Sequence, residues 1–285
     1  MSGAEPGAGA EDWAGETGRS WLANLQKFES MIAPIGAALI THAQFKPGER
    51  VLDIGCGGGG TTINIGRSVS PGGHATGLDI SQELIWSCGA RAAMGTPSDV
   101  RFVCADAATA TVTGAPYDRL FSRFGTMFFE DARAAFRNLR QMVRDGGRID
   151  LAVWAPPEKN AWITTLMGAL AKHVELPARE PHAPGPFAFA DTDYLRAVLA
   201  QAGMGEVEIT PCEQMLPIGG AGATPEEAAE MLLSTLSIGK AAQAGGPEKM
   251  DAVKAELATA LAAYHVPGKG NMLGGKAWIV TAKAV

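Results

Sequence analysis

The segment VLDIGCGGGG, residues 51–60, decides the fold of this chain. Its first four residues are apolar apart from Asp53, as in a short strand buried in a parallel sheet. The glycines that follow let the main chain turn tightly, and helical spacing begins at Thr61. A strand, a glycine turn and a helix in this order allow a ligand to approach the main chain at the helix N-terminus.

Strands and helices continue to alternate along the chain after this segment. Apolar runs bounded by turn residues predict strands at residues 74–80, 100–104, 117–124 and 148–154. Amphipathic spacing predicts helices at residues 61–68, 82–93 and 130–143. This alternation is typical of an α/β fold with a doubly wound, Rossmann-like and mostly parallel sheet.

The alternation becomes irregular after residue 154. The expected helices are residues 162–173, 191–202, 225–236 and 249–264, and the expected strands are residues 207–210 and 276–284. We therefore expect residues 19–285 to form a single domain. Residues 155–190 and 212–273 would make a mainly helical cap over the active end of the sheet, where the parallel strands finish. A separate second domain is the alternative.

Two features precede the first strand. Residues 1–18 lack the basic start and the apolar run of a signal peptide, and they predict a flexible tail. Residues 21–43 show helical spacing, which Pro34 is expected to interrupt.

The composition excludes several classes of protein. Hydrophobic residues make up 46% of the chain and charged residues 19%, enough to fill a core. The formal net charge is -6 and no basic run occurs, which argues against a nucleic-acid partner. The longest apolar stretch, residues 31–40, contains Pro34 and is shorter than the roughly 20 residues of a membrane span.

The four cysteines, Cys56, Cys88, Cys104 and Cys212, form no CxxC pair. Together with the missing signal peptide, they predict reduced thiols and a cytoplasmic location. No His, Cys and Asp cluster has the spacing of metal ligands, so we expect no metal.

The glycine segment matches two cofactor motifs. Gly55-x-Gly57-x-x-Gly60 matches the dinucleotide fingerprint, and Asp53-x-Gly55-x-Gly57-x-Gly59 matches the S-adenosylmethionine (SAM) motif of class I methyltransferases. A carboxylate at Asp53 would repel a pyrophosphate, whereas the sulfonium and ammonium groups of SAM tolerate a nearby acid. Asp53 therefore favours SAM. It could instead only orient the glycine turn.

Two more carboxylates follow the next strands. Asp79 lies 24 residues after Gly55 and can accept both ribose hydroxyls of either cofactor, or it can cap a helix. Asp106 can accept from the exocyclic amine of an adenine, or it can serve only in a turn. The carboxyl ends of successive parallel strands are where an open sheet of this type binds ligands.

With these residues in place, the chain resembles the class I SAM-dependent methyltransferases. The resemblance rests on VLDIGCGGG, GLDIS, ADA, SRFGTMFF and LRQMVRDGGRIDLAVW at residues 51–59, 77–81, 105–107, 122–129 and 139–154. Residues 13–28 resemble the start of small-molecule members related to ubiquinone/menaquinone methyltransferases. The resemblance implies SAM as cofactor and a seven-stranded sheet whose last strand, residues 276–284, is antiparallel.

The resemblance and the strand-end positions together indicate a site with two parts. The cofactor-binding candidates are Trp21, Asp53, Gly55, Cys56, Gly57, Asp79, Ile80, Asp106, Ala107 and Ser122. The candidates for an apolar substrate pocket are Arg123, Phe124, Met127, Phe128, Trp154 and Trp162. Arg123 could pair with a substrate carboxylate or with an internal acid. Asp150 lies near the other end of its strand and is expected to be structural.

The sequence does not assign a general base. His173, His182, Tyr194 and His265 lie in or beside the expected cap and are weak candidates, since surface or packing roles suit each of them equally. The cap length indicates a small, partly hydrophobic organic acceptor. The enzyme would be a monomer or a homodimer.

Three other functions remain as alternatives. One is a nicotinamide-dependent oxidoreductase, and another is a SAM-binding protein without transferase activity. The third, methylation of nucleic-acid bases, is disfavoured because the segment after the fourth strand is SRFG rather than an Asn/Asp-Pro-Pro-aromatic run.

Overall fold

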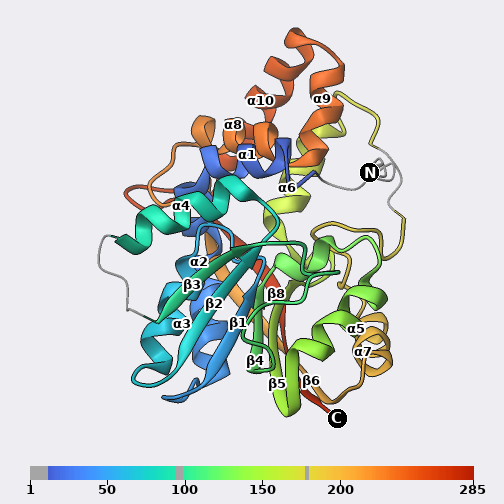
Figure 1. The fold of residues 1–285 in the computed structure, drawn as a ribbon. Helices are drawn as coiled ribbons and strands as arrows, with labels where there is room; N and C mark the ends of the chain where they lie inside the picture. Colours follow the sequence, from blue (N-terminus) through green and yellow to red (C-terminus); the bar gives the residue numbers. More distant parts are fainter. Residues whose placement is uncertain (1–11, 94–98, 177–179) are drawn as a thin grey trace, which may run out of the picture.

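The computed structural model describes residues 12–93, 99–176 and 180–285. Within these residues eight strands form one sheet (Figure 1). The strands are β1 (Arg50–Ile54), β2 (His74–Asp79), β3 (Val100–Cys104), β4 (Tyr117–Arg123), β5 (Val143–Trp154), β6 (Met204–Ile218), β7 (His265–Val266) and β8 (Gly270–Ala284). The order is β3-β2-β1-β4-β5-β8-β6, with the short β7 paired to β8.

The first five strands are parallel, and β8 runs antiparallel to both β5 and β6. The predicted fold class, a doubly wound and mostly parallel sheet with an antiparallel last strand, is therefore confirmed. The described residues form eight strands rather than the expected seven, because the two-residue β7 adds a short pairing to β8. From β1 the chain winds outward through β2 to β3, and then returns to β4 on the other side of β1. The strand order thus reverses between β1 and β4, and a crevice opens at such a switch point.

The helices that connect the parallel strands cover both faces of the sheet. They are α3 (Gly60–Val69), α4 (Gln82–Ala93) and α5 (Ala132–Met142). The connection from β1 to β2 and the connection from β4 to β5 run in opposite directions across the sheet. Because such crossovers are right-handed, α3 and α5 lie on opposite faces of the sheet. Helix α7 (Thr192–Gln201) packs beside α5.

Helix α2 (Leu25–Ala43) covers β5 and β6 and runs through Pro34 without a break. The expected interruption is therefore wrong. Pro34 lacks the N–H that would bond the carbonyl of Ser30, one turn earlier. The buried face of α2, which includes Ile35 and Leu39, packs on the sheet and holds the helix together despite the missing bond.

A group of helices lies over the carboxyl ends of the parallel strands, at the top of Figure 1. They are α1 (Glu16–Ala23), α6 (Ala161–Leu170), α8 (Pro225–Thr235), α9 (Lys240–Ala244) and α10 (Pro247–Ala262). Three short 3₁₀ turns, η1 (Gly125–Phe128), η2 (Pro157–Lys159) and η3 (Ser237–Gly239), complete the elements. Helix α10 packs against α8 and α6, and α1 packs against α8, so these helices form one cap.

The expected cap segment 212–273 is wrong at both ends. Strand β6 continues to Ile218, and β8 already begins at Gly270. The two strands pair in register from Cys212 with Ala277 to Ile218 with Asn271. The prolines at 211 and 217 concealed this length, because prolines disfavour central strands but are tolerated in an edge strand such as β6.

The expected tail also ends earlier than predicted. Residues 1–11 lie outside the described residues, but residues 12–18 form a turn and the start of α1. Asp12 accepts a hydrogen bond of 3.1 Å from the Glu16 N–H, and the Trp13 ring packs against Phe128 with centroids 4.7 Å apart. These contacts order the residues that the sequence pattern assigned to the tail. In the segment 155–190, residues 177–179 lie outside the described part.

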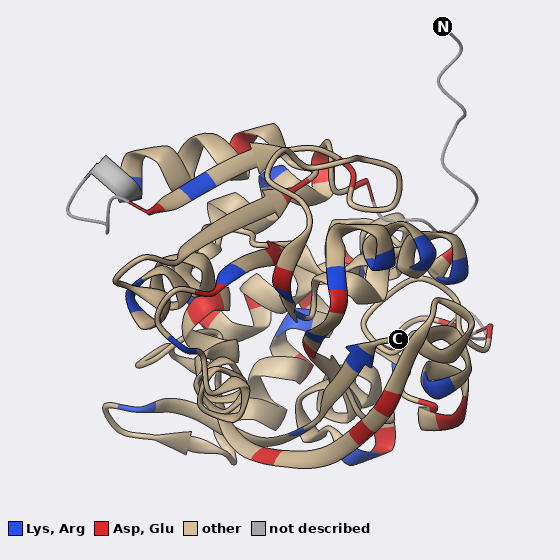
Figure 2. Ribbon diagram, turned by 60° about the horizontal axis from the view of Figure 1, so that its bottom comes forward, with Lys and Arg blue, Asp and Glu red and all other residues tan. Residues whose placement is uncertain are grey.

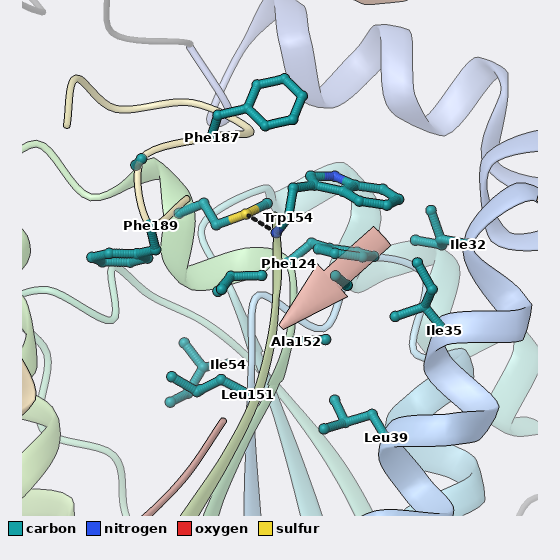
Figure 3. Close-up of a cluster of buried hydrophobic side chains, with 14 of the residues drawn as sticks. Ile32, Ile35, Leu39, Ile54, Phe124, Leu151, Ala152, Trp154, Phe187 and Phe189 are labelled. Carbon is teal, nitrogen blue, oxygen red and sulfur yellow. Dashed lines mark hydrogen bonds between the residues drawn. The ribbon is translucent and has the colours of Figure 1, made fainter. Parts of the chain in front are cut away.

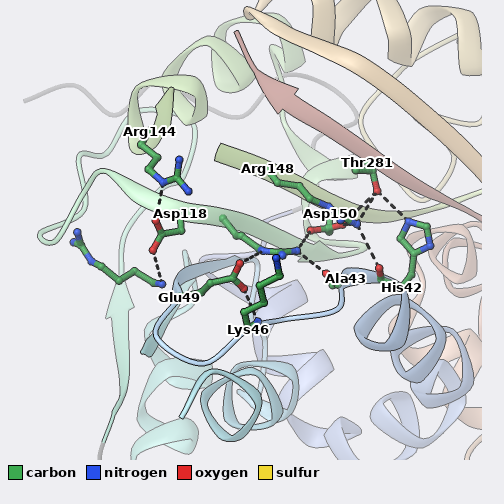
Figure 4. A network of polar contacts seen from close by, with 11 residues as sticks. His42, Ala43, Lys46, Glu49, Asp118, Arg144, Arg148, Asp150 and Thr281 are labelled. Atoms are coloured by element: carbon green, nitrogen blue, oxygen red, sulfur yellow. Dashed lines mark hydrogen bonds and ion pairs between the residues drawn. The ribbon is translucent and has the colours of Figure 1, made fainter. Parts of the chain in front are cut away.

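A buried polar network surrounds Asp150 in the sheet (Figure 4). Asp150 in β5 is fully buried and pairs with Arg119 at 3.3 Å and with Arg148 at 2.6 Å. Thr281 of β8 donates to the same carboxylate at 3.3 Å. Asp150 therefore links β4, β5 and β8, as its predicted structural role requires.

Charged residues are spread over the described part of the chain. Figure 2 shows Lys and Arg interspersed with Asp and Glu along the ribbon. Several form ion pairs on the surface, such as Arg144 with Asp118 at 2.7 Å and Lys276 with Glu213 at 2.8 Å. Among the helices of the described residues, none combines the length and the hydropathy needed to cross a membrane.

Candidate active site

A cavity of about 610 Å³ opens at the switch point between β1 and β4. Its floor is formed by the ends of β1, β2 and β4, and residues from α1 and α2 lie over it. We call the part around Gly55, Cys56 and Gly57 the glycine end. Pockets of this volume hold small molecules and cofactors.

The glycine end is shaped by residues with positive φ. Gly55 has φ 64° and Gly57 has φ 56°, which side chains rarely adopt. A Cβ on Gly55 would lie 2.7 Å from the Cα of Gly125, so the turn packs tightly against the chain that leaves β4. A Cβ on Gly57 would meet only the Trp21 Nε1 at 3.8 Å. The main chain at Gly57 is therefore open to the cavity.

Asp79 ties the end of β2 to the glycine turn and lines the cavity. Its Oδ2 accepts from the Gly57 N–H at 2.8 Å, and its Oδ1 accepts from the Ser81 N–H at 3.0 Å. Burial raises the pKa of Asp79, while these two hydrogen bonds act in the opposite direction. The neighbouring candidate Ile80 also lines the cavity and is 41% exposed.

Asp106 and Ala107 line the same end of the cavity, after β3. Asp106 also makes the turn: its Oδ1 accepts from the Ala108 N–H at 2.8 Å and its Oδ2 from the Thr109 hydroxyl at 3.4 Å. The two roles considered for this residue are thus compatible, since a carboxylate has further lone pairs.

Two of the predicted cofactor residues do not line the cavity. Asp53 is fully buried, and its Oδ2 accepts from the hydroxyls of Thr61 and Thr62, both at 2.7 Å. This geometry matches the alternative role of orienting the glycine turn and the start of α3. Ser122 is also fully buried and donates to the carbonyl of Ile54 at 2.7 Å. Both side chains hold β1 in place beneath the cavity.

Burial dominates the titration of Asp53. It raises the pKa of this carboxyl to about 6, although the two threonine hydroxyls and the charge of Arg123 stabilise the ionised form. The second oxygen, Oδ1, is buried without a hydrogen-bond partner.

The other end of the cavity is apolar and aromatic, and we call it the aromatic end (Figure 3). The five predicted apolar pocket residues all line it, namely Phe124, Met127, Phe128, Trp154 and Trp162. The rings of Phe124 and Trp154 stack with centroids 4.3 Å apart. Phe124 has a positive φ of 68°, and its N–H donates to the Ala152 carbonyl at 2.9 Å. This strained turn directs the ring into the cavity.

Aromatic residues of the N-terminal segment lie over the cavity. Trp21 stacks on Phe28 with centroids 4.1 Å apart, and Trp13 meets Trp21 edge-on at 5.6 Å. Both tryptophans line the cavity, so the expected place of Trp21 agrees with the structure. Trp13 was not among the predicted site residues.

The four weak candidates for a general base do not line the cavity. His182 stacks on Tyr194 with centroids 3.8 Å apart and contacts Asp191 at 3.2 Å. His265 contacts the Asn271 side chain at 3.2 Å, and the Nε2 of His173 is buried without a hydrogen-bond partner. Tyr194 lies in α7 and His265 in β7, so the structure gives none of the four residues a place beside a ligand in the cavity.

Sequence reasoning missed Glu29, which lines the glycine end. Its two carboxylate oxygens accept from Arg91 at 2.7 and 2.8 Å, and Arg91 also donates to the Gly58 carbonyl at 2.7 Å. These three residues come from distant segments, so no local motif could have revealed them. Across the part of the chain that the structure describes, no cluster of His, Cys, Asp or Glu could hold a metal ion.

Comparison with known proteins finds similarity to methyltransferases. Residues 51–147 match the family model described as "Methyltransferase domain". An uncharacterized protein of Mycobacterium tuberculosis is 28% identical over 155 residues, 54% of each chain. Nocamycin O-methyltransferase of Saccharothrix syringae is 27% identical over 124 residues, 44% of each chain. The chain spans about half the length of the first curated relatives it matches.

Solved structures share the fold. The YcgJ protein of Bacillus subtilis has a TM-score of 0.57 and 17% identity, covering 87% of this chain and 97% of that one. Phosphoethanolamine N-methyltransferase 2 of Haemonchus contortus, solved with phosphomonomethylethanolamine and S-adenosylhomocysteine, has a TM-score of 0.53 and 14% identity, covering 94% and 59%.

Residues 51–147 therefore match a methyltransferase domain, for which SAM is the implied cofactor, and the fold of the chain is shared by solved SAM-dependent methyltransferases. The resemblance seen in the sequence is confirmed at this level. The relation to ubiquinone/menaquinone methyltransferases is not specified by these matches and stays a prediction. The dinucleotide alternative is not supported by them.

Proposed function

We propose that this chain transfers a methyl group from SAM to a small, partly hydrophobic organic acceptor. One observation carries the proposal: a single cavity joins the glycine end to the aromatic end. A cofactor on the glycine turn and an acceptor among the aromatic rings would therefore share one enclosed space. Methyl transfer requires such contact, because the nucleophile, the methyl carbon and the sulfur must lie in line.

The residues of the glycine end fit SAM. The open main chain at Gly57 leaves room for a ligand that a side chain would exclude. The carboxylates of Asp79 and Asp106 both line the cavity and suit the ribose hydroxyls and the adenine amine. Asp53 would act indirectly, through the glycine turn that it holds in place. The main-chain carbonyl oxygens of Gly55 and Ser122 would accept from the ammonium group of SAM.

When bound, SAM supplies an electrophilic methyl group on a sulfonium. The chain's own part is to orient the acceptor and to exclude water. Trp154 and Trp162 are 4% and 2% exposed, so the aromatic end presents apolar ring surface and favours flat or apolar acceptors. Trp13 and Trp21 would shield the reacting atoms from the side of α1.

Carboxylates are the side chains of the cavity that could remove a proton, among them Glu130 and Asp131. Among the residues that line the cavity in the described part of the chain, there is no histidine and no tyrosine. An acceptor atom that is already unprotonated near neutral pH suits this cavity, because it needs no general base. An acidic enol or phenol with a pKa below neutral meets this condition, whereas an ordinary phenol, thiol or alkylamine, with a pKa of about 10, 8.5 or 10, does not.

The experiment is to incubate the protein with SAM and a panel of small aromatic and aliphatic acceptors and to measure S-adenosylhomocysteine. Formation of this product together with a methylated acceptor supports the proposal. Trp162→Phe should lower acceptor turnover and leave cofactor affinity unchanged. Trp86→Phe is the matched control, because Trp86 is 69% exposed on α4 and should have no effect. A protein that binds SAM but methylates nothing in the panel would instead favour a binding module.

Two further expectations belong to this proposal. The chain would act as a monomer or a homodimer without a nucleic-acid partner, and it would be located in the cytoplasm. The mixed surface charge supports the absence of a nucleic-acid partner, since a phosphate backbone requires a basic face.

A further inference from the structure

Arg123 occupies a special position in the cavity wall. It is the last residue of β4, directly after Ser122, and it lines the cavity beside the glycine end. Its side chain passes along α2 at Gly36, where a Cβ would lie 3.0 Å from both the Cδ and the Nη1 of Arg123. The absence of a side chain at Gly36 therefore gives the guanidinium its room.

The guanidinium of Arg123 has no partner within the described residues. It forms no hydrogen bond and no ion pair, and its Nε is buried. The nearby acids are engaged elsewhere: Asp53 accepts from two threonine hydroxyls, and Glu29 is held by Arg91 through two hydrogen bonds. Burial lowers the pKa of Arg123, although the charges of Asp53 and Glu29 act in the opposite direction.

Two other arginines of the described residues, the buried Arg119 and the partly buried Arg148, have acidic partners. Arg119 pairs with Glu49 at 3.0 Å and with Asp150 at 3.3 Å, and Arg148 pairs with Asp150. A guanidinium carries five donors in a planar fork that matches a carboxylate. Leaving such a group without an acceptor is costly, so an unpaired arginine at a cavity wall suits an anionic ligand.

We propose that Arg123 binds a carboxylate inside the cavity. The inference rests on the proposed function, which supplies two sources for this group: the methionine end of the cofactor, or an acidic acceptor. The position favours the cofactor. Its methionine end would lie at the glycine end, and Arg123 lines the cavity there, directly after the Ser122 that donates to the carbonyl of Ile54 before the glycine turn.

The first arm of the test uses two ligands that differ only in the carboxylate, S-adenosylhomocysteine and its decarboxylated form, in calorimetry. The wild-type protein should bind S-adenosylhomocysteine about 10- to 100-fold more tightly, as expected for charge-assisted hydrogen bonds. Arg123→Met should remove this preference, and Arg123→Lys should keep part of it. Arg67→Met is the control, because Arg67 is exposed on α3 and should retain the full preference.

The second arm tests the acceptor as the source. Benzoate and benzyl alcohol are titrated into protein saturated with S-adenosylhomocysteine. One outcome assigns the carboxylate to the acceptor. In it, Arg123→Met still prefers S-adenosylhomocysteine to its decarboxylated form, and it binds benzyl alcohol but no longer binds benzoate. If both ligand pairs behave in Arg123→Met as in the wild type, the proposal is overturned. A wild-type protein that does not bind S-adenosylhomocysteine at all would instead refute the proposed function.

The ligand-free protein gives an independent readout. Because Arg123 has no internal partner, Arg123→Met should leave the unfolding midpoint in urea unchanged or raise it. Arg119→Met, which breaks a buried pair, should lower the midpoint clearly. A comparable loss for Arg123→Met would show that the guanidinium has a structural role, and it would contradict the proposal.

Discussion

The carboxylate of Asp79 accepts a hydrogen bond of 2.8 Å from the main-chain N–H of Gly57, 22 residues earlier in the chain. This bond joins the end of β2 to the glycine turn that follows β1. The same side chain lines the cavity, so it both shapes the turn and offers acceptor oxygens to a ligand.

The first prediction concerns this residue. Asp79→Ala removes the carboxylate that would accept the ribose hydroxyls, and it frees the Gly57 N–H. The affinity for S-adenosylhomocysteine should fall by about 2–4 kcal/mol in calorimetry, as expected for charged hydrogen bonds lost in a buried site. Asp145→Ala is the control, because the Asp145 side chain is 92% exposed, far from the cavity. An unchanged affinity in Asp79→Ala would remove this residue from the site.

The second prediction concerns pH and Asp53. Burial raises the pKa of this carboxyl from 3.8 to about 6, so the folded protein binds its proton more tightly than the unfolded chain. The resulting stabilisation is fully present below pH 3.8 and is lost as the pH rises through about 6. At 1.36 kcal/mol for each pKa unit, the loss is about 3 kcal/mol.

Asp53→Asn isolates this effect, since the amide oxygen can still accept from the threonine hydroxyls but does not titrate. The difference in unfolding free energy, wild type minus Asp53→Asn, should decrease between pH 4 and pH 7 in urea titrations. Other acids contribute equally to both proteins and cancel. A difference that stays constant or increases over this range would contradict the assigned pKa.

The third prediction separates stability from function at Asp150. Asp150→Ala leaves Arg119 and Arg148 buried without this partner, and it should destabilise the fold by about 3–5 kcal/mol. The affinity of the folded protein for S-adenosylhomocysteine should not change, because neither Asp150 nor its partners Arg119 and Arg148 line the cavity. A loss of affinity without a loss of stability would be inconsistent with a structural role.

The fourth prediction concerns closure of the cavity. Residues 13–28 and 155–190 should become more protected from hydrogen exchange when S-adenosylhomocysteine binds. The first segment carries Trp13 and Trp21 over the cavity, and the second carries Trp162 at its aromatic end. A ligand between these rings would slow their opening. Strand β6 serves as an internal reference. Equal exchange of residues 13–28 in both states would exclude a closing role for that segment.

Local patterns predicted the parts of the fold that neighbouring residues determine. The strand, glycine turn and helix at residues 51–69 follow from apolar and glycine positions alone, and the bounds predicted for α4 and β3 agree with the structure. The carboxylates of Asp79 and Asp106 could be placed because parallel strands finish at one edge of the sheet.

Features that depend on distant partners were not predictable in this way. The length of β6 depends on its pairing with β8, which compensates for the prolines of β6. The inward or outward position of His173 and His265 depends on how the cap helices pack. The unpaired state of Arg123 is visible only once Glu29, Arg91 and Asp53 are seen to be engaged with other groups.

Direct calorimetric titration of the wild-type protein with S-adenosylhomocysteine, and separately with NAD, tests the central claim that the glycine end holds SAM. We predict saturable binding of S-adenosylhomocysteine at one site per chain, weakened by Asp79→Ala, and no binding of NAD. Binding of NAD in preference to S-adenosylhomocysteine, or binding of neither, would contradict the account.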